Sequence, residues 1–169
     1  EPFLRDFLSL APPPLPRDST IGPITPTSPG FTGFVFKIQA NMDPRHRDRI
    51  AFVRIVSGRF EAGMEVRQVR TGKPMRLRSP QQFMARERTA IEEAWPGDVI
   101  GVMDRGVLRI GDTLSAAGDL EFQGIPRFPP EHFAQVIPTD PLRRKQLDTG
   151  LRELSEEGAA QVFYAQGEA

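Results

Sequence analysis

Apolar and polar side chains alternate along residues 32–40, with the two-residue period of a β-strand. One side of this expected strand carries Phe34, Phe36, Ile38 and Ala40, and the other carries Val35, Lys37 and Gln39. Further short extended segments, separated by glycine and proline turns, are expected at 49–57, 64–70, 75–78, 82–85, 90–93, 99–103 and 113–116. Many short strands with tight turns favour a closed β-barrel, because closure leaves no sheet edge unpaired.

Two turns within this region share a Gly-Asp pair followed by an extended segment: Gly97-Asp98 and Gly111-Asp112. Glycine can adopt the positive φ that a tight turn requires, and the Asp side chain can accept a backbone hydrogen bond. We therefore predict that both pairs form turns that lead into strands.

The residues before the expected barrel follow a different pattern. Within residues 1–10 the apolar side chains have helical spacing, which predicts the end of an amphipathic helix. Seven prolines between residues 11 and 30 predict a semi-extended linker, since proline removes a backbone donor and restricts its predecessor. Residues 1–30 are thus interpreted as the last helix of a preceding domain and a proline-rich linker.

A third pattern begins after the barrel, for which we expect residues 31–122. Residues 125–138 are rich in proline and include an extended piece at 134–137. Asp140 and Pro141 are suited to the start of a helix, and Gly158 to its end. A strand is expected at 159–164. The fold class is therefore mainly β, with 123–169 as the truncated beginning of an α/β domain.

The charge is zero over the whole chain but is unevenly distributed. Residues 31–90 hold thirteen Lys or Arg against five Asp or Glu, whereas residues 91–169 hold seven against fourteen. A basic block favours a polyanionic partner such as nucleic acid. The alternative is that the arginines simply occupy the solvated faces of strands.

The loop at 41–49 concentrates this basic character. It places four cationic or titratable groups within five positions, and Asp43 and Asp48 lie beside them. Guanidinium groups bind phosphate oxygens in pairs, so the loop could contact a phosphate backbone. It could equally be a self-neutralised surface loop. Our candidates for contact with RNA are Lys37, Arg45, His46, Arg47, Arg49, Arg54 and Arg59.

The sequence argues against several functional classes. Cysteine is absent and only two histidines occur, so neither a metal centre nor thiol chemistry is expected. The only Gly-Lys pair, Gly72-Lys73, is followed by Pro74, and Arg67 stands where a phosphate-binding loop needs its first glycine. We expect no catalytic residue within this chain. No apolar run approaches the roughly 20 residues of a membrane span, and a cytoplasmic location is expected.

Specific segments resemble a known family. Residues 31–44, 46–52, Ser57-Gly58 and Gly63-Met64 are similar to bacterial peptide chain release factor 3, a family of translational GTPases. Residues 92–101 and 110–113 resemble the second domain of translational GTPases in general. Residues 140–147 and 154–163 are again similar to the release factor family.

The resemblance implies a GTPase domain, a β-barrel (domain II) and a ferredoxin-like α/β domain III. This chain would hold the tail of the first, all of the second and the opening of the third. The implied function is to bind the ribosome and use GTP to promote dissociation of the decoding release factors. Implied partners are small-subunit ribosomal RNA and proteins, the decoding factors indirectly, and the protein's own GTPase domain, with no membrane. GTP or GDP with Mg²⁺ belongs to the parent protein, and no cofactor is expected within these residues.

Two alternatives stay open. One is domain II of an elongation-factor-G-like or ribosomal protection GTPase. The other is a free-standing RNA-binding β-barrel, which would expose aromatic side chains for base stacking. We instead expect the four phenylalanines at apolar strand or turn positions to lie in the core: Phe34, Phe36, Phe52 and Phe60.

Overall fold

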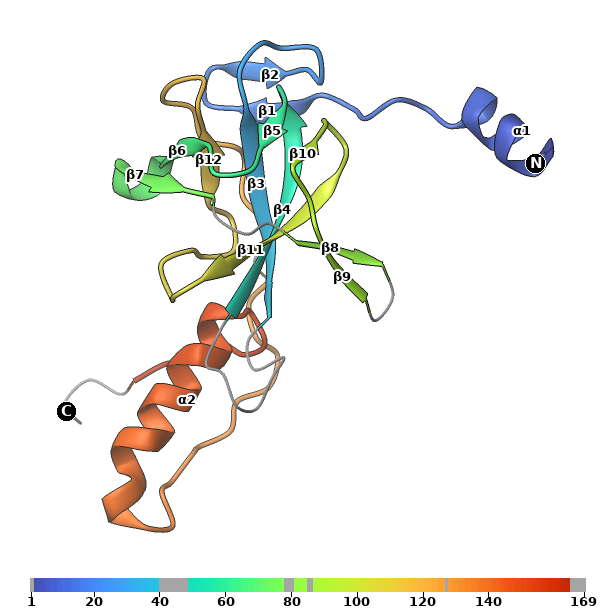
Figure 1. Cartoon of the computed structure of the whole chain (residues 1–169). Coiled ribbons are helices and arrows are strands. Elements are labelled where there is room, and N and C mark those ends of the chain that lie inside the picture. The colour runs from blue at the N-terminus through green and yellow to red at the C-terminus, as the bar shows by residue number, and fades with distance from the viewer. Residues whose placement is uncertain (1, 40–48, 78–80, 85–86, 127, 165–169) are drawn as a thin grey trace.

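The computed structural model describes residues 2–39, 49–77, 81–84, 87–126 and 128–164 (Figure 1). The helices are α1 (Pro2–Leu10) and α2 (Arg144–Glu156), with short 3₁₀ turns at Val69–Thr71 and Pro141–Arg143. The strands are β1 (Arg17–Ser19), β2 (Gly22–Ile24), β3 (Thr32–Gln39), β4 (Arg49–Ser57), β5 (Phe60–Glu61), β6 (Glu65–Gln68), β7 (Lys73–Arg76), β8 (Gln81–Met84), β9 (Glu87–Ala90), β10 (Glu93–Ala94), β11 (Val99–Asp104) and β12 (Thr113–Ser115). The predicted mainly β fold is confirmed.

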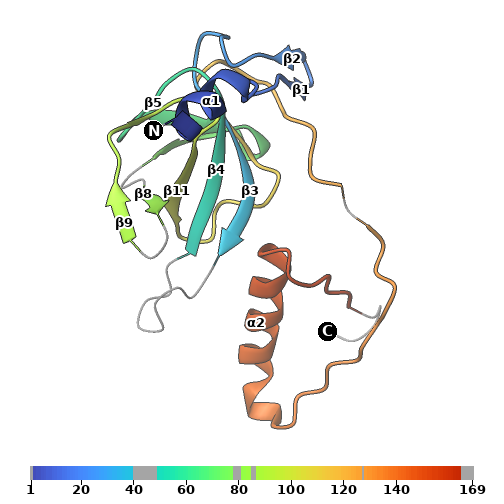
Figure 2. The ribbon, with the colours of Figure 1, turned by 90° about the vertical axis from the view of Figure 1, so that its right-hand side faces the viewer.

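The central feature is a curved antiparallel sheet of eight strands in the order β7-β6-β12-β3-β4-β11-β8-β9 (Figures 1 and 2). A separate pair, β5 with β10, extends the strand-rich region. Among the described residues no ladder joins β7 to β9, so the described part of the barrel is a curled sheet. Its inner face carries one buried apolar cluster, which includes Val35, Val53, Phe60 and Ile100.

The two Gly-Asp turns form as predicted and contact the sheet in the same way. Gly97 and Gly111 both have positive φ, at 102° and 94°. Gly97 N donates to Ile55 O at 2.9 Å, and Ile55 N donates to Asp98 O at 2.9 Å. The other turn makes the same two bonds to Val35, at 2.8 and 2.9 Å. Each turn therefore fixes one residue of a central strand.

A β-bulge follows each of these fixed residues. In the β3–β4 ladder, Phe36 and Val56 have no partner, because the register shifts beside each of them. A bulge puts an extra residue into one strand and reverses the alternation of side chains after it. Phe34 consequently lies on the outer face and Ile38 on the inner face, so the expectation that they share one side is wrong.

Residues 17–24, expected to be linker, form a hairpin that packs on the outer face of the sheet. Thr20 N donates to Glu121 O at 2.9 Å, and Gln123 N donates to Asp18 O at 3.2 Å. The Arg17 guanidinium lies 3.8 Å from the centre of the Phe34 ring, within a second apolar cluster. That cluster consists of Phe34, Val56, Leu120 and Phe122, with Ile24 against it. The proline content led us to expect a linker here instead of a hairpin. The sequence pattern could not reveal the hairpin, because its stability comes from contacts with residues about 100 positions away.

At the C-terminal end, the predicted helix signals are confirmed. Asp140 Oδ1 accepts the Leu142 N–H at 2.9 Å, ahead of α2. Gly158 has a φ of 74°, and Gly158 N and Ala159 N donate back to Ser155 O and Leu154 O. This pair of bonds is a Schellman motif.

The strand expected at 159–164 is absent from the described structure, where this segment is extended but unpaired. The neighbouring extended segment contains Pro129, Pro130 and Pro138, which cannot donate to a ladder. The two segments meet through the Phe133 and Phe163 rings, 5.9 Å apart, and border a cavity of about 730 Å³ against α2. Helix α1, whose formation was also predicted, has no buried residue.

Candidate nucleic-acid interface

Arg49 is the first residue of β4 and lies opposite Asp104 in the ladder with β11. Its side chain is 8% exposed, and Nη2 donates to Asp104 Oδ2 and to Leu108 O, both at 3.0 Å. Nη1 donates to Glu156 Oε2, in the last turn of α2, at 2.5 Å. This one guanidinium thus joins the sheet to the C-terminal helix.

The electrostatics of Arg49 follow from this burial. Desolvation lowers the pKa of its guanidinium, but hydrogen bonds and charge attraction from Glu156 and Asp104 outweigh it, so the pKa is raised overall. Nε is buried and has no hydrogen-bond partner among the described residues. Asp104 is satisfied independently, because its Oδ1 accepts the N–H groups of Val107 and Leu108 at 2.9 and 3.1 Å.

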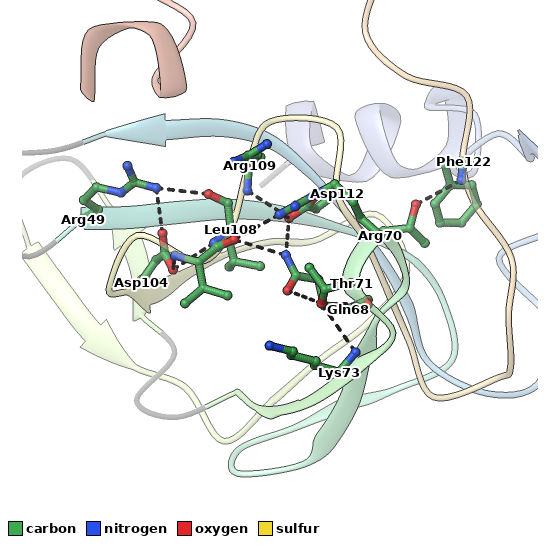
Figure 3. Close-up of polar contacts among 12 residues, drawn as sticks. Arg49, Gln68, Arg70, Thr71, Lys73, Asp104, Leu108, Arg109, Asp112 and Phe122 are labelled. Carbon is green, nitrogen blue, oxygen red and sulfur yellow. Dashed lines mark hydrogen bonds and ion pairs between the residues drawn. The ribbon is translucent and has the colours of Figure 1, made fainter. Parts of the chain in front are cut away.

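A second buried carboxylate lies at the other end of the same loop (Figure 3). Asp112 accepts from Gln68 Nε2 at 2.6 Å, from Arg70 Nε at 2.5 Å and from the Arg109 N–H at 2.9 Å. The hydrogen bond with Asp112 raises the pKa of Arg70. Residues 104–112 are therefore held at both ends by Arg–Asp contacts, of which Arg49–Asp104 is buried and Arg70–Asp112 is partly exposed on the arginine side, as Figure 3 shows.

The structure distributes the candidate contact residues among different environments. Arg45, His46 and Arg47 lie outside the described residues. Arg49 is buried in the network above, so its guanidinium does not face solvent. Arg59 is half-exposed, but it pairs with Glu93 and Glu61 and lies 5.4 Å from the Trp95 ring.

Lys37 and Arg54 differ from the other described candidates. Both are exposed on the outer face of the sheet, and no described carboxylate pairs with either of them. Lys37 Nζ lies 5.3 Å from the centre of the Phe52 ring, and the Phe36 ring centre lies 6.4 Å from that of Phe52. Together Phe36, Lys37, Phe52 and Arg54 form a surface that we call the β3–β4 outer patch.

Sequence reasoning placed all four phenylalanines in the core, and only part of that expectation is confirmed. Phe34 and Phe60 are buried, whereas Phe36 is 37% exposed and Phe52 is half-buried. The exposure of Phe36 follows from the β-bulge after Val35. The related sequence feature is the second Gly-Asp turn, which bonds to Val35 immediately before that bulge. Asp104 and Glu156, the partners of Arg49, left no signal because they are distant in sequence.

Other functional classes find no site in the described structure. No group of three or more His, Cys, Asp or Glu side chains is arranged to hold a metal ion among the described residues. Neither described helix has the length and apolar character needed to traverse a bilayer.

Two parts of the chain, the strand-rich region and the C-terminal segment, each match a family model of known proteins. Residues 30–117, more than half of the chain, match the family model of elongation factor G domain 2. Residues 122–169 match the model of the class II release factor RF3 C-terminal domain. A curated relative, peptide chain release factor 3 of Symbiobacterium thermophilum, is 59% identical over 163 residues. That alignment covers 96% of this chain but only 31% of the relative, so the chain spans about a third of the relative's length. With an elongation-factor-type sheet continuing into a segment that matches a release factor model, this chain belongs to the elongation factor G domain 2 family and is a homologue of about a third of peptide chain release factor 3.

Proposed function

We propose that the chain is the ribosome-docking and coupling region of a GTP-dependent release factor that promotes dissociation of decoding release factors. Residues 1–30 would connect it to a GTPase domain, 31–122 form domain II and 123–169 open domain III. GTP or GDP with Mg²⁺ would bind to that GTPase domain of the parent protein, which acts with ribosomes in the cytoplasm.

The observation that carries this proposal is the Arg49 ion-pair network. Arg49 and Asp104 lie in the segment that matches elongation factor G domain 2, whereas Glu156 lies in the release-factor-specific segment. The Arg49–Glu156 contact between the two segments is charge-assisted and partly buried, and it would hold them in one relative orientation. A nucleotide-dependent movement upstream would then reorient both segments together and change the affinity for the ribosome.

The docking contacts would be electrostatic. Lys37 and Arg54 supply exposed positive charge, and Arg45, His46 and Arg47, which lie outside the described residues, stay predicted contacts. Arg59 is the weaker candidate, because Glu93 and Glu61 already compensate its charge. Arg49 would act through orientation of the two segments, since its guanidinium is buried.

A salt titration of binding to small ribosomal subunits tests this function. If about five phosphates are neutralised, log affinity should fall with log salt at a slope of roughly −3.5 to −4.5. Lys37→Gln and Arg54→Gln should each reduce the slope by about 0.7–0.9, and Lys73→Gln on β7 is the matched control. A salt-independent affinity would contradict the docking proposal.

The free-standing RNA-binding barrel is the second candidate, favoured by the exposure of Phe36. It predicts that the chain binds free RNA as tightly as ribosomes. The coupling proposal instead predicts tighter binding to ribosomes and a dependence on the Arg49–Glu156 contact. Comparing the two affinities for the wild-type chain and for Glu156→Gln separates the candidates.

A further inference from the structure

The two bulges of the β3–β4 ladder are structurally equivalent. Each follows a residue, Val35 or Ile55, that exchanges two backbone hydrogen bonds with a Gly-Asp turn. Each leaves one residue without a ladder partner, Phe36 on β3 and Val56 on β4. The same local construction therefore projects one apolar side chain from the outer face at each of the two sites.

The two projecting side chains have different surroundings. Val56 is 6% exposed, because the β1–β2 hairpin cluster with Phe34, Leu120 and Phe122 covers it. Phe36 is 37% exposed, although its ring is the larger apolar group. Among the described residues, the chain thus covers the bulge at Val56, whereas the Phe36 ring at the other bulge stays exposed and can contact a ligand.

The groups around Phe36 define the chemistry of that ligand. The bulge turns Phe36 and Lys37 outward together, and Phe52 packs against the Phe36 ring with the planes at 51°. Arg54 lies two residues beyond Phe52 on the same face of β4, about 6.6 Å further along the strand. The apolar component is one supported ring, and the same face of the sheet carries two cations without a described carboxylate partner, Lys37 beside Phe36 and Arg54 on the neighbouring strand. An anionic ligand with a planar face fits this arrangement.

We propose that Phe36 is a stacking platform for an unpaired RNA base, with Lys37 and Arg54 contacting the phosphates beside that base. The inference rests on the proposed ribosome-docking function and specifies single-stranded RNA as the target. Aromatic rings bind bases irrespective of sequence, and adjacent cations follow the phosphate backbone. A protein ligand would be expected to need a broader apolar area than one ring on a face with two charges provides.

The test measures binding of the whole chain to a fluorescein-labelled oligouridine of about twelve nucleotides, and to an RNA duplex of the same length. The chain should prefer the single strand. Phe36→Leu keeps an apolar side chain but removes the π face, and it should weaken single-strand binding roughly 5- to 150-fold. Phe36→Tyr should bind like the wild type, and Phe128→Leu, at an exposed phenylalanine in the C-terminal segment, is the control.

Salt dependence separates this proposal from the function on which it rests. Phe36→Leu should leave the salt slope unchanged, whereas Lys37→Gln should reduce it by about 0.7. A flat slope for the wild type overturns the docking function itself. A normal slope with unaltered affinity in Phe36→Leu overturns only the stacking platform. If Phe36→Leu weakens binding to ribosomes but not to oligouridine, the ligand is a protein and the platform is likewise refuted.

Discussion

Replacing Arg49 with Met tests whether the buried network holds the two segments together. Met keeps an apolar stem in the same space but removes the donors to Asp104 and Glu156. Loss of one partner from a buried ion pair typically costs about 3–5 kcal/mol, because the other charge stays buried. Asp104 retains its hydrogen bonds from Val107 and Leu108, so we expect the lower end, about 3 kcal/mol.

Glu156→Gln is the milder change to the same contact. The Glu156 side chain is 25% exposed, so water can replace part of what is lost, and we expect about 1 kcal/mol. The two substitutions act on a shared contact and should not be additive. A double-mutant cycle should give a coupling free energy of about 1 kcal/mol, within the range for residues in direct contact.

Denaturant unfolding of the chain measures both values, with Arg59→Met as the matched control. The ion pairs of Arg59 and its contact with the Trp95 ring are all exposed, so its substitution should cost about 1 kcal/mol or less. Amide hydrogen exchange would show whether α2 loses protection in Glu156→Gln while the sheet keeps its own. If Arg49→Met costs no more than Arg59→Met, or if the cycle shows no coupling, the network does not join the two segments.

Three other substitutions test local features of the fold, each by thermal or denaturant unfolding. Gly58→Ala should lower the free energy of unfolding by about 3 kcal/mol or more, because a Cβ would overlap the backbone of residues 30 and 31 and φ is positive, at 68°. Gly63→Ala, with open space at its Cβ, should lower it by about 1 kcal/mol. Equal losses for the two variants would contradict this reasoning. Asp112→Asn should cost about 2–3 kcal/mol, because Asn cannot accept all of the bonds from Gln68, Arg70 and the Arg109 N–H. Its control is Asp98→Asn at the equivalent, exposed turn, which should cost under about 1 kcal/mol. Arg17→Met removes the contact with Phe34 and the hydrogen bond to Gln123 O, so it should cost about 1–2 kcal/mol. It should also lower the protection of the β1–β2 hairpin against amide hydrogen exchange. Unchanged protection would mean that Arg17 does not anchor the hairpin.

Features set by neighbouring residues were predictable from the sequence. The Asp140 cap, the Gly158 helix end and both Gly-Asp turns depend on residues within a few positions of each other, and all four form as expected. The β1–β2 hairpin was missed because it is stabilised by residues 120–123, far along the chain. The expected strand at 159–164 has no ladder partner among the described residues, which sequence periodicity could not reveal because pairing depends on residues distant along the chain.

Of the described candidate interface, only the two exposed cations were predictable from the sequence, because a charged side chain favours solvent over the core. Lys37 and Arg54 were correctly expected at strand positions, and the structure places both in solvent. The alternation rule put Phe36 in the core, since a single bulge reverses every later position and leaves no mark in the alternation itself. Arg49 was grouped with the loop arginines by adjacency, although the β4–β11 ladder places it against Asp104.

The uneven charge along the chain has a largely internal explanation. Arginines of the basic part pair with carboxylates of the acidic part: Arg49 with Asp104 and Glu156, Arg59 with Glu93, Arg67 with Asp119, and Arg70 with Asp112. Much of the excess of positive charge in residues 31–90 therefore links strands and segments, and it is not available to a polyanion. At the outer patch, Lys37 and Arg54 have no described carboxylate partner, and they lie on the same face of the sheet as the exposed Phe36 ring. If RNA binds as we propose, the exposed Phe36 ring, and not the total charge of residues 31–90, would determine where on this face it binds.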